Sequence, residues 1–167
     1  MKFLANEKFP LKSVLYLQNK GFDIQAIGVD NHYRVVGVSY WSQGEFYYAL
    51  VHLFKSQELY KRLGNHLGKG NATMNIGLVY ADHKDYGRAL EHFLRANQLF
   101  EKLGRDDRIG ITYNKIGSVY LEKGELDKAG KYLFDGLYIH TRNNFSFGIL
   151  EACNRIGLKT RSLLRTR

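Results

Sequence analysis

The apolar positions of this sequence repeat with two periods, one of a helical turn and one of forty residues. Over residues 86–103, apolar and small side chains stand three and four positions apart, which is the stripe of an amphipathic helix. The same stripe returns forty residues upstream and downstream, and four glycines keep its register: Gly37, Gly77, Gly117 and Gly157. A period of this length is typical of a solenoid, in which each unit buries its apolar face by stacking on its neighbours.

Each repeat is predicted to form two helices joined by a short turn. The turns fall at 42–44, 83–85 and 123–125, and Gly64 and Gly104 are placed to end second helices as left-handed caps. The third unit has Asn143 and Asn144 at this place. Asparagine is the second choice for such a cap, so a helix end is predicted there too.

Small residues recur in register inside the predicted helices. A glycine in a helix costs roughly 1 kcal/mol relative to alanine, so its repetition indicates a compensating gain. We expect that gain from close packing, with Gly77 of the first helix facing small residues such as Ala89 and Ala96 of the second. Large apolar side chains fill the spaces between them, and they include Leu53, Phe93 and Leu133.

The repeat divides one all-α domain into five segments. They are an N-terminal cap helix over 1–30, three repeats over 31–66, 67–106 and 107–146, and a basic cap helix over 147–167. The last segment repeats a first helix without a second one. It is therefore predicted either to close the array or to begin a further repeat.

Composition adds little that is specific. The chain of 167 residues has a single proline, Pro10, and no linker-like stretch. Charged residues interrupt its N-terminal apolar run, and no apolar span reaches the length of a transmembrane helix, so a soluble cytoplasmic protein is expected.

The net charge of +9 arises from 25 basic and 16 acidic residues, and five of the cations lie in residues 155–167. A cap helix with one solvated side is the first interpretation of this basic tail. Docking on nucleic acid or an anionic membrane surface is the second.

No residue pattern predicts catalysis, a metal site or a cofactor. The stretch from Gly64 to Gly70 has three residues between its first two glycines where a phosphate loop has four, and Gly70 follows the lysine, so a flexible turn is expected. The six histidines are scattered without metal-ligand spacing. Cys153 occupies a repeat position where it is expected to pack as a small apolar residue.

The repeat resembles the tetratricopeptide repeat family. The residues that carry the resemblance in the third unit are Tyr113, Ile116, Gly117, Tyr120, Ala129, Leu133 and Gly136. The family's late proline is missing and the period is forty, as in the long-helix variant of G-protein-signalling modulator scaffolds, kinesin light chains and bacterial Rap-type regulators. The resemblance implies a right-handed α-solenoid of antiparallel helix pairs.

In this family the first helix of each repeat lines a concave groove that binds peptides. The corresponding positions here are Asn31, Arg34, Val38, Trp41, Asn71, Met74, Asn75, Leu78, Ala81, Ile111, Asn114, Lys115, Ser118, Leu121, Asn154, Arg155 and Leu158. Packing between helices is the alternative interpretation of the apolar ones, Met74, Leu78, Leu121 and Trp41. Asn75 stands where long-repeat relatives hold the ligand backbone.

The groove positions include a cation in three repeats: Arg34, Lys115 and Arg155. They predict a scaffold or adaptor that binds an acidic and hydrophobic peptide or helix of a partner protein. The family's clamp for chaperone tails is not expected, because its Lys and Asn positions hold pairs such as Met74 and Leu78. The alternative is a peptide-responsive fragment of a signalling or transcription-regulatory system, and self-association through terminal repeats is a third possibility.

Overall fold

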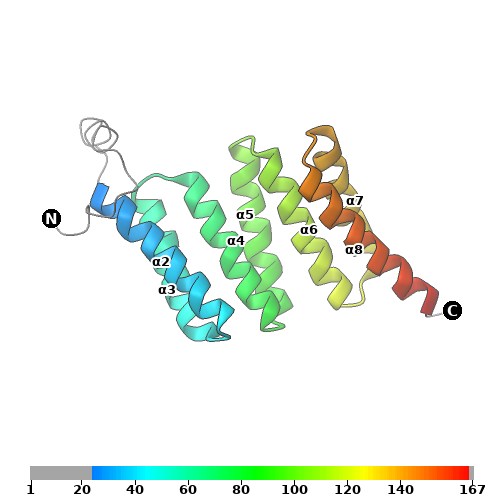
Figure 1. Ribbon diagram of the computed structural model, residues 1–167, viewed down its shortest axis with the longest axis horizontal. Coiled ribbons are helices and arrows are strands. Elements are labelled where there is room, and N and C mark those ends of the chain that lie inside the picture. The colour runs from blue at the N-terminus through cyan, green and yellow to red at the C-terminus, as the bar shows by residue number, and fades with distance from the viewer. Residues whose placement is uncertain (1–23, 166–167) are drawn as a thin grey trace.

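The chain forms a row of helices in the part that the computed structural model describes, which is residues 24–165 for the backbone and 32–157 for exposure. All regular elements of this part are helices, as predicted. They are α2 (Ile24–Ser42), α3 (Phe46–Arg62), α4 (His66–Asp82), α5 (Tyr86–Lys102), α6 (Asp106–Glu122), α7 (Leu126–Arg142) and α8 (Ser146–Arg165). Figure 1 shows them side by side from one end of the molecule to the other.

The helices keep the register of the sequence repeat. The helices α4, α6 and α8 begin at residues 66, 106 and 146, and α3, α5 and α7 begin at 46, 86 and 126. Each helix from α3 to α7 has 17 residues. The helix α2 begins at Ile24. The first repeat was expected to begin at Asn31, but the residues from Ile24 to Asp30 are helical as well. Residues 1–23 of the predicted N-terminal cap helix lie outside the described residues.

The connections between helices share one backbone conformation. The second connecting residue has a positive φ angle each time, and these residues are Gly44, Gly64, Lys84, Gly104, Gly124 and Asn144. The left-handed caps predicted at Gly64, Gly104 and Asn144 are therefore confirmed, with φ angles of 65°, 61° and 55°. Lys84, at 61°, adopts this conformation without the freedom of glycine.

The recurring glycines let paired helices approach closely. A Cβ atom on Gly77 would lie 2.7 Å from the ring of Phe93, and one on Gly117 would lie 2.7 Å from Leu133 Cγ. Phe93 and Leu133 are fully buried. The predicted close approach of the helices is therefore confirmed, with Phe93 and Leu133 as the side chains that face these two glycines. Gly157 differs, since a Cβ atom there would meet no atom within 4 Å.

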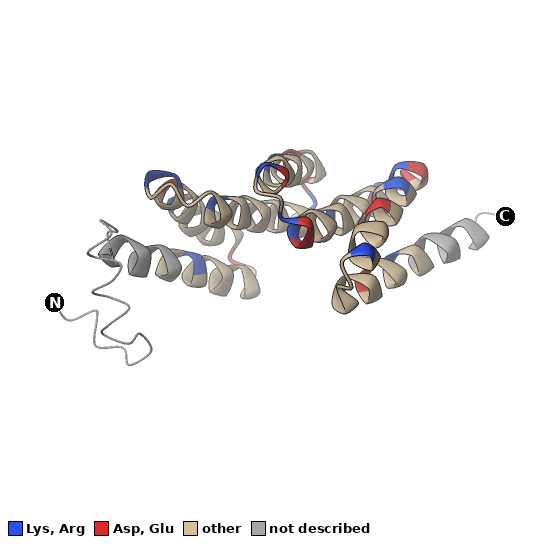
Figure 2. Cartoon of the chain, turned by 90° about the horizontal axis from the view of Figure 1, so that it is seen from above, with Lys and Arg blue, Asp and Glu red and all other residues tan. Residues whose placement is uncertain are grey.

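The helices that come first in each pair lie on the inner side of the array. Consecutive first helices contact each other, as α2 with α4, α4 with α6 and α6 with α8. The second helices α3 and α5 do not pack together in the described part of the chain, and neither do α5 and α7. Seen from above, the array therefore bends into an arc, with its two end helices displaced toward the same side (Figure 2).

Charge is spread along the array. Figure 2 shows residues of both signs at many points of the described helices instead of one basic face. The side chains of Leu158 and of the basic tail beyond it lie outside the described residues, so the nucleic-acid and membrane hypotheses for the tail stay predictions. Within the described range, none of the helices combines the length and apolar character needed to cross a membrane.

Candidate peptide groove

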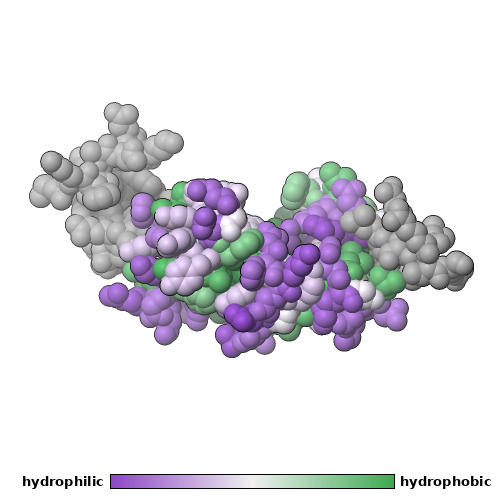
Figure 3. Space-filling model, turned by 90° about the horizontal axis from the view of Figure 1, so that it is seen from below, coloured by the Kyte–Doolittle hydropathy of each residue, from purple (hydrophilic) through white to green (hydrophobic). Residues whose placement is uncertain are grey.

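A hollow of about 440 Å³ lies on the inner side of the array, between α4, α6 and α8. Its lining residues are Leu78, Ala81, Asp82, Lys84, Tyr86, Phe93, Lys115, Ser118, Val119, Glu122 and Arg155. Five of the predicted groove positions are among them, namely Leu78, Ala81, Lys115, Ser118 and Arg155. The outline of the molecule dips between its two ends in Figure 3, where apolar patches alternate with hydrophilic ones.

The C-terminal halves of α4 and α6 lie next to each other in the lining of the hollow. Leu78 and Asp82 are one helical turn apart on α4, and Ser118 and Glu122 are their counterparts forty residues later on α6. The Ser118 hydroxyl donates a hydrogen bond of 2.7 Å to the Asn114 carbonyl of its own helix. It can still accept a hydrogen bond from a ligand.

Lys115 is paired inside the fold. Its Nζ atom lies 2.7 Å from Glu151 Oε1 of α8, and the two side chains are only 23% and 17% exposed. A half-buried pair of this kind ties the last two first helices together, and it lowers the net charge that Lys115 offers to a ligand. Of the three cations expected in the groove, Lys115 is therefore the one paired with a carboxylate of the next first helix.

Two carboxylates that the sequence analysis did not select, Asp82 and Glu122, also line the hollow. They face the same space as the cations Lys84, Lys115 and Arg155, so the lining has mixed charge. Their signal was available in the sequence, because each stands four residues after a predicted groove position on the same helix face. A lining that contains both carboxylates and cations does not favour an acidic partner over a basic one.

Trp41 extends the surface toward the N-terminal end. Its indole Nε1 donates a hydrogen bond of 2.7 Å to Asp82 Oδ2, which joins α2 to α4. The ring is half-buried, so part of its face stays open to solvent. Trp41 and the hollow thus share Asp82 as a common neighbour.

Met74 and Asn114 lie inside the array and not on the groove surface. Met74 is 8% exposed and Asn114 is fully buried. The Asn114 Nδ2 atom lies 3.5 Å from His140 Nε2, and its Oδ1 atom occupies the space that a Cβ atom on Gly136 would need. The glycine at 136 on α7 thus admits the side chain of Asn114, and the packing interpretation holds for Met74.

The other predicted positions are divided between packing and exposure. Val38 packs on the cluster of Ala49 and Leu53. Half-buried side chains are those of Arg34, Asn71, Asn75, Ile111 and Leu121. Asn154 is exposed, and the side chain of Asn31 lies outside the described residues. The structure therefore brings together the C-terminal halves of the first helices and not every predicted groove residue.

The sequence profile of the tetratricopeptide repeat matches residues 71–136, which contain α5 and α6 and parts of α4 and α7. Residues 71–136 of the chain therefore consist of tetratricopeptide repeats. Arrays of such repeats serve as modules for protein–protein interaction. No match was found among curated protein sequences.

Three solved structures resemble this tetratricopeptide array. Aspartyl phosphate phosphatase F from Bacillus subtilis is 18% identical, with a TM-score of 0.71 over 74% of this chain and 32% of its own. RapI in its apo form is 18% identical, with a TM-score of 0.74 over 83% of this chain and 39% of its own. BtubC from P. vanneervenii is 14% identical, with a TM-score of 0.65 over 84% of this chain and 62% of its own. The chain thus spans less than two thirds of each relative, and the likeness concerns the fold alone.

The tetratricopeptide array offers no cluster for metal binding in its described part, where no three His, Cys, Asp or Glu side chains gather. Cys153 is exposed on α8, although the sequence pattern predicted a packed position. No second helix covers that face of α8 within the described residues, which is why the side chain remains accessible.

Proposed function

We propose that this array binds a peptide segment of a partner protein in the hollow between α4, α6 and α8. The observation that carries the proposal is the hollow itself, which spans three consecutive first helices and combines apolar with charged lining. Leu78 and Ala81 give it apolar surface, while Asp82 and Lys115 offer groups for polar contacts. A site of this composition suits an amphipathic segment with charges of both signs.

Asn75 supports the proposal at the level of the ligand backbone. It is half-buried on α4, one turn before Leu78 on the same helix. A carboxamide both donates and accepts, so it can pair with the amide and carbonyl of an extended peptide. We place Met74 and Asn114 outside the binding surface, because both are buried.

The experiment uses a matched pair of substitutions. Peptides are selected against the whole chain from a displayed library, and their affinities are measured by fluorescence anisotropy. Leu78→Asp in the hollow is expected to weaken binding at least tenfold. Leu94→Asp, on a 41% exposed apolar side chain of α5 that does not line the hollow, is expected to change it less than twofold. Equal effects of the two substitutions would refute the groove.

A peptide-responsive regulator is the second candidate. The observation that favours it is the likeness to aspartyl phosphate phosphatase F and RapI, of which this chain covers 32% and 39%. As a sensor, the array should change its curvature when a peptide binds, whereas an adaptor should keep it. Small-angle scattering with and without a selected peptide distinguishes them, because only the sensor is expected to change its radius of gyration.

A further inference from the structure

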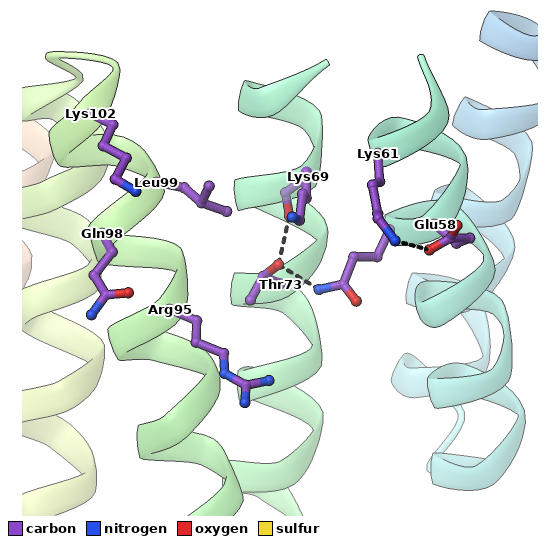
Figure 4. Close-up of a pocket in the computed structure, with 9 residues that line it drawn as sticks. Glu58, Lys61, Lys69, Thr73, Arg95, Gln98, Leu99 and Lys102 are labelled. Carbon is purple, nitrogen blue, oxygen red and sulfur yellow. Dashed lines mark hydrogen bonds and ion pairs between the residues drawn. The ribbon is translucent and has the colours of Figure 1, made fainter. Parts of the chain in front are cut away.

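A second cavity, of about 400 Å³, lies on the outer side of the array. It is lined by α3 and α5, which do not contact each other, and by α4 between them. Figure 4 shows Glu58 and Lys61 on α3, Arg95, Gln98, Leu99 and Lys102 on α5, and Lys69 and Thr73 on α4 between them. We call this cavity the basic pocket, because Lys61, Lys69, Arg95 and Lys102 line it together with a single carboxylate, Glu58. It shares no lining residue with the groove.

The cations of the basic pocket are weakly neutralised. Lys61 lies 3.6 Å from Glu58, in a pair whose side chains are both more than 60% exposed. Arg95 pairs at 2.6 Å with Glu91, which does not line the pocket. Exposed pairs of this kind contribute well under about 1 kcal/mol, so an anionic ligand can displace them. Lys69 and Lys102 have no carboxylate partner among the described residues.

The centre of the pocket is open because residue 73 is small. The Thr73 hydroxyl donates to the Lys69 carbonyl at 2.7 Å and accepts from Gln57 Nε2 at 2.6 Å, which holds its side chain against α3 and α4. The positions forty residues before and after Thr73 hold tyrosines, Tyr33 and Tyr113. In the next repeat the Tyr113 ring packs against Tyr132, with 5.6 Å between ring centroids, so threonine leaves a space that an aromatic ring takes there.

The next junction along the array shows that the fold does not require the basic pocket. Forty residues on, three of its four cations, Lys61, Lys69 and Arg95, are replaced by Glu101, Ile109 and Asp135. The fourth, Lys102, corresponds to Arg142, which pairs with Asp106 at 2.8 Å. Burial and the nearby charges of Glu101 and Asp135 raise the pKa of the Tyr113 phenol, so that junction is filled and acidic. The same helix packing thus occurs without the cavity and with the opposite charge.

We propose that the basic pocket binds the phosphate groups of an anionic ligand. A phosphate group carries almost two negative charges and three acceptor oxygens, so it can engage several lysines arranged around it, whereas one carboxylate satisfies fewer. The lining contains no aromatic side chain on which a base could stack. The pocket therefore recognises the phosphate itself, whether it belongs to a free polyphosphate or to a phosphorylated side chain.

The test is isothermal titration calorimetry of the whole chain with inorganic tripolyphosphate in a phosphate-free buffer of low ionic strength. Thr73→Tyr keeps every cation and fills the cavity with the residue of the neighbouring repeats. Arg95→Asp introduces the residue of the next junction. Each variant is expected to weaken binding at least tenfold, and circular dichroism verifies its helix content.

The matched control is Lys131→Glu on α7. It makes the same change of two charges as Arg95→Asp, at an exposed position outside the pocket, and Glu91 holds the equivalent position one repeat earlier. Its affinity for tripolyphosphate should stay within twofold of the wild type. A wild-type chain that does not bind, a control that weakens as much as Arg95→Asp, or a folded Thr73→Tyr variant that binds like the wild type would each overturn the proposal.

A parallel titration separates the two sources of phosphate. A short phosphoserine peptide is compared with the same peptide containing serine. If the phosphopeptide binds more tightly than tripolyphosphate, and Arg95→Asp abolishes the difference from the serine peptide, the ligand is a phosphorylated protein segment. If tripolyphosphate binds more tightly and the two peptides do not differ, the ligand is a free polyphosphate. Binding of neither probe contradicts the proposal.

Discussion

At the scale of single residues, the repeat supplies its own reference for each position. Gly77 and Gly157 are equivalent in the sequence repeat, yet only Gly77 is pressed against a ring, that of Phe93. Lys84 is equivalent to Gly44 and Gly124, yet only Lys84 has a side chain on a left-handed backbone. Because the backbone is shared, differences between equivalent positions isolate one physical effect at a time.

The glycine pair gives the first prediction. Gly77→Ala gains helix propensity but places a methyl group 2.7 Å from Phe93, so we expect a net loss of about 1–3 kcal/mol in the free energy of unfolding. Gly157→Ala meets no such neighbour and should gain up to about 1 kcal/mol. Urea denaturation followed by circular dichroism measures both. Changes of the same sign would contradict the role of Gly77 as a packing residue.

The turn residue Lys84 gives the second prediction. Its left-handed backbone costs a non-glycine residue roughly 1–2 kcal/mol, and glycine recovers this at the expense of some chain entropy. We expect Lys84→Gly to raise stability by up to about 1 kcal/mol. The reverse change at the equivalent position, Gly124→Lys, should lower it by a similar amount. Thermal unfolding of the two variants measures the effect, and an unchanged melting temperature in both would show that the turn is not strained.

At the scale of helices, each pair is joined by a stacked ring contact that recurs with the repeat. Tyr40 stacks on His52 and Tyr80 on His92, each with 5.4 Å between ring centroids. The third pair replaces the histidine by tyrosine, with Tyr120 and Tyr132 at 5.7 Å. The position thus takes either a histidine or a tyrosine ring, and only histidine ordinarily titrates near neutral pH.

We expect three histidines, His52, His92 and His140, to make stability depend on pH. Burial lowers the pKa of His92, which nearby Arg95 lowers further while Glu91 opposes it, and burial also lowers the pKa of His52 and His140. A histidine with a lower pKa when folded binds fewer protons than it does when unfolded. Its full contribution is therefore present above the unfolded pKa near 6.5 and is lost as the pH falls below it.

We predict that the free energy of unfolding decreases between pH 7 and pH 5. His92→Tyr, which introduces the ring of the third repeat, should reduce this decrease, because one lowered pKa corresponds to about 1.4 kcal/mol for each pH unit by which it is lowered. Urea titrations at several pH values measure how steeply the free energy of unfolding changes with pH. An identical slope in wild type and variant would show that His92 does not contribute to it.

At the scale of the whole molecule, periodicity in the sequence was enough to predict the helices, their turns and the family. Gly37, Gly77 and Gly117 could be predicted as packing residues because packing within a repeat depends on residues of that repeat. The groove was harder to predict. The pairing of Lys115 depends on Glu151, which lies on α8 beyond the third repeat.

The basic pocket shows the same limit of sequence reasoning. Its cations come from three helices, and none of them belongs to a recognisable motif. Comparison of positions forty residues apart identifies Thr73 as unusual between Tyr33 and Tyr113, but only the arrangement of α3, α4 and α5 shows that the small residue leaves a cavity. Properties shared by all repeats were thus predictable, and properties of one junction were not.

Chemical-shift mapping by NMR tests most directly whether a peptide binds in the hollow between α4, α6 and α8. A peptide selected for binding is titrated into the ¹⁵N-labelled chain. If the peptide binds there, we expect the largest amide shifts at residues that line the hollow, namely Leu78, Asp82, Ser118, Glu122 and Arg155. Shifts confined to Arg95, Gln98 and Lys102, on the outer side of the array, would contradict it.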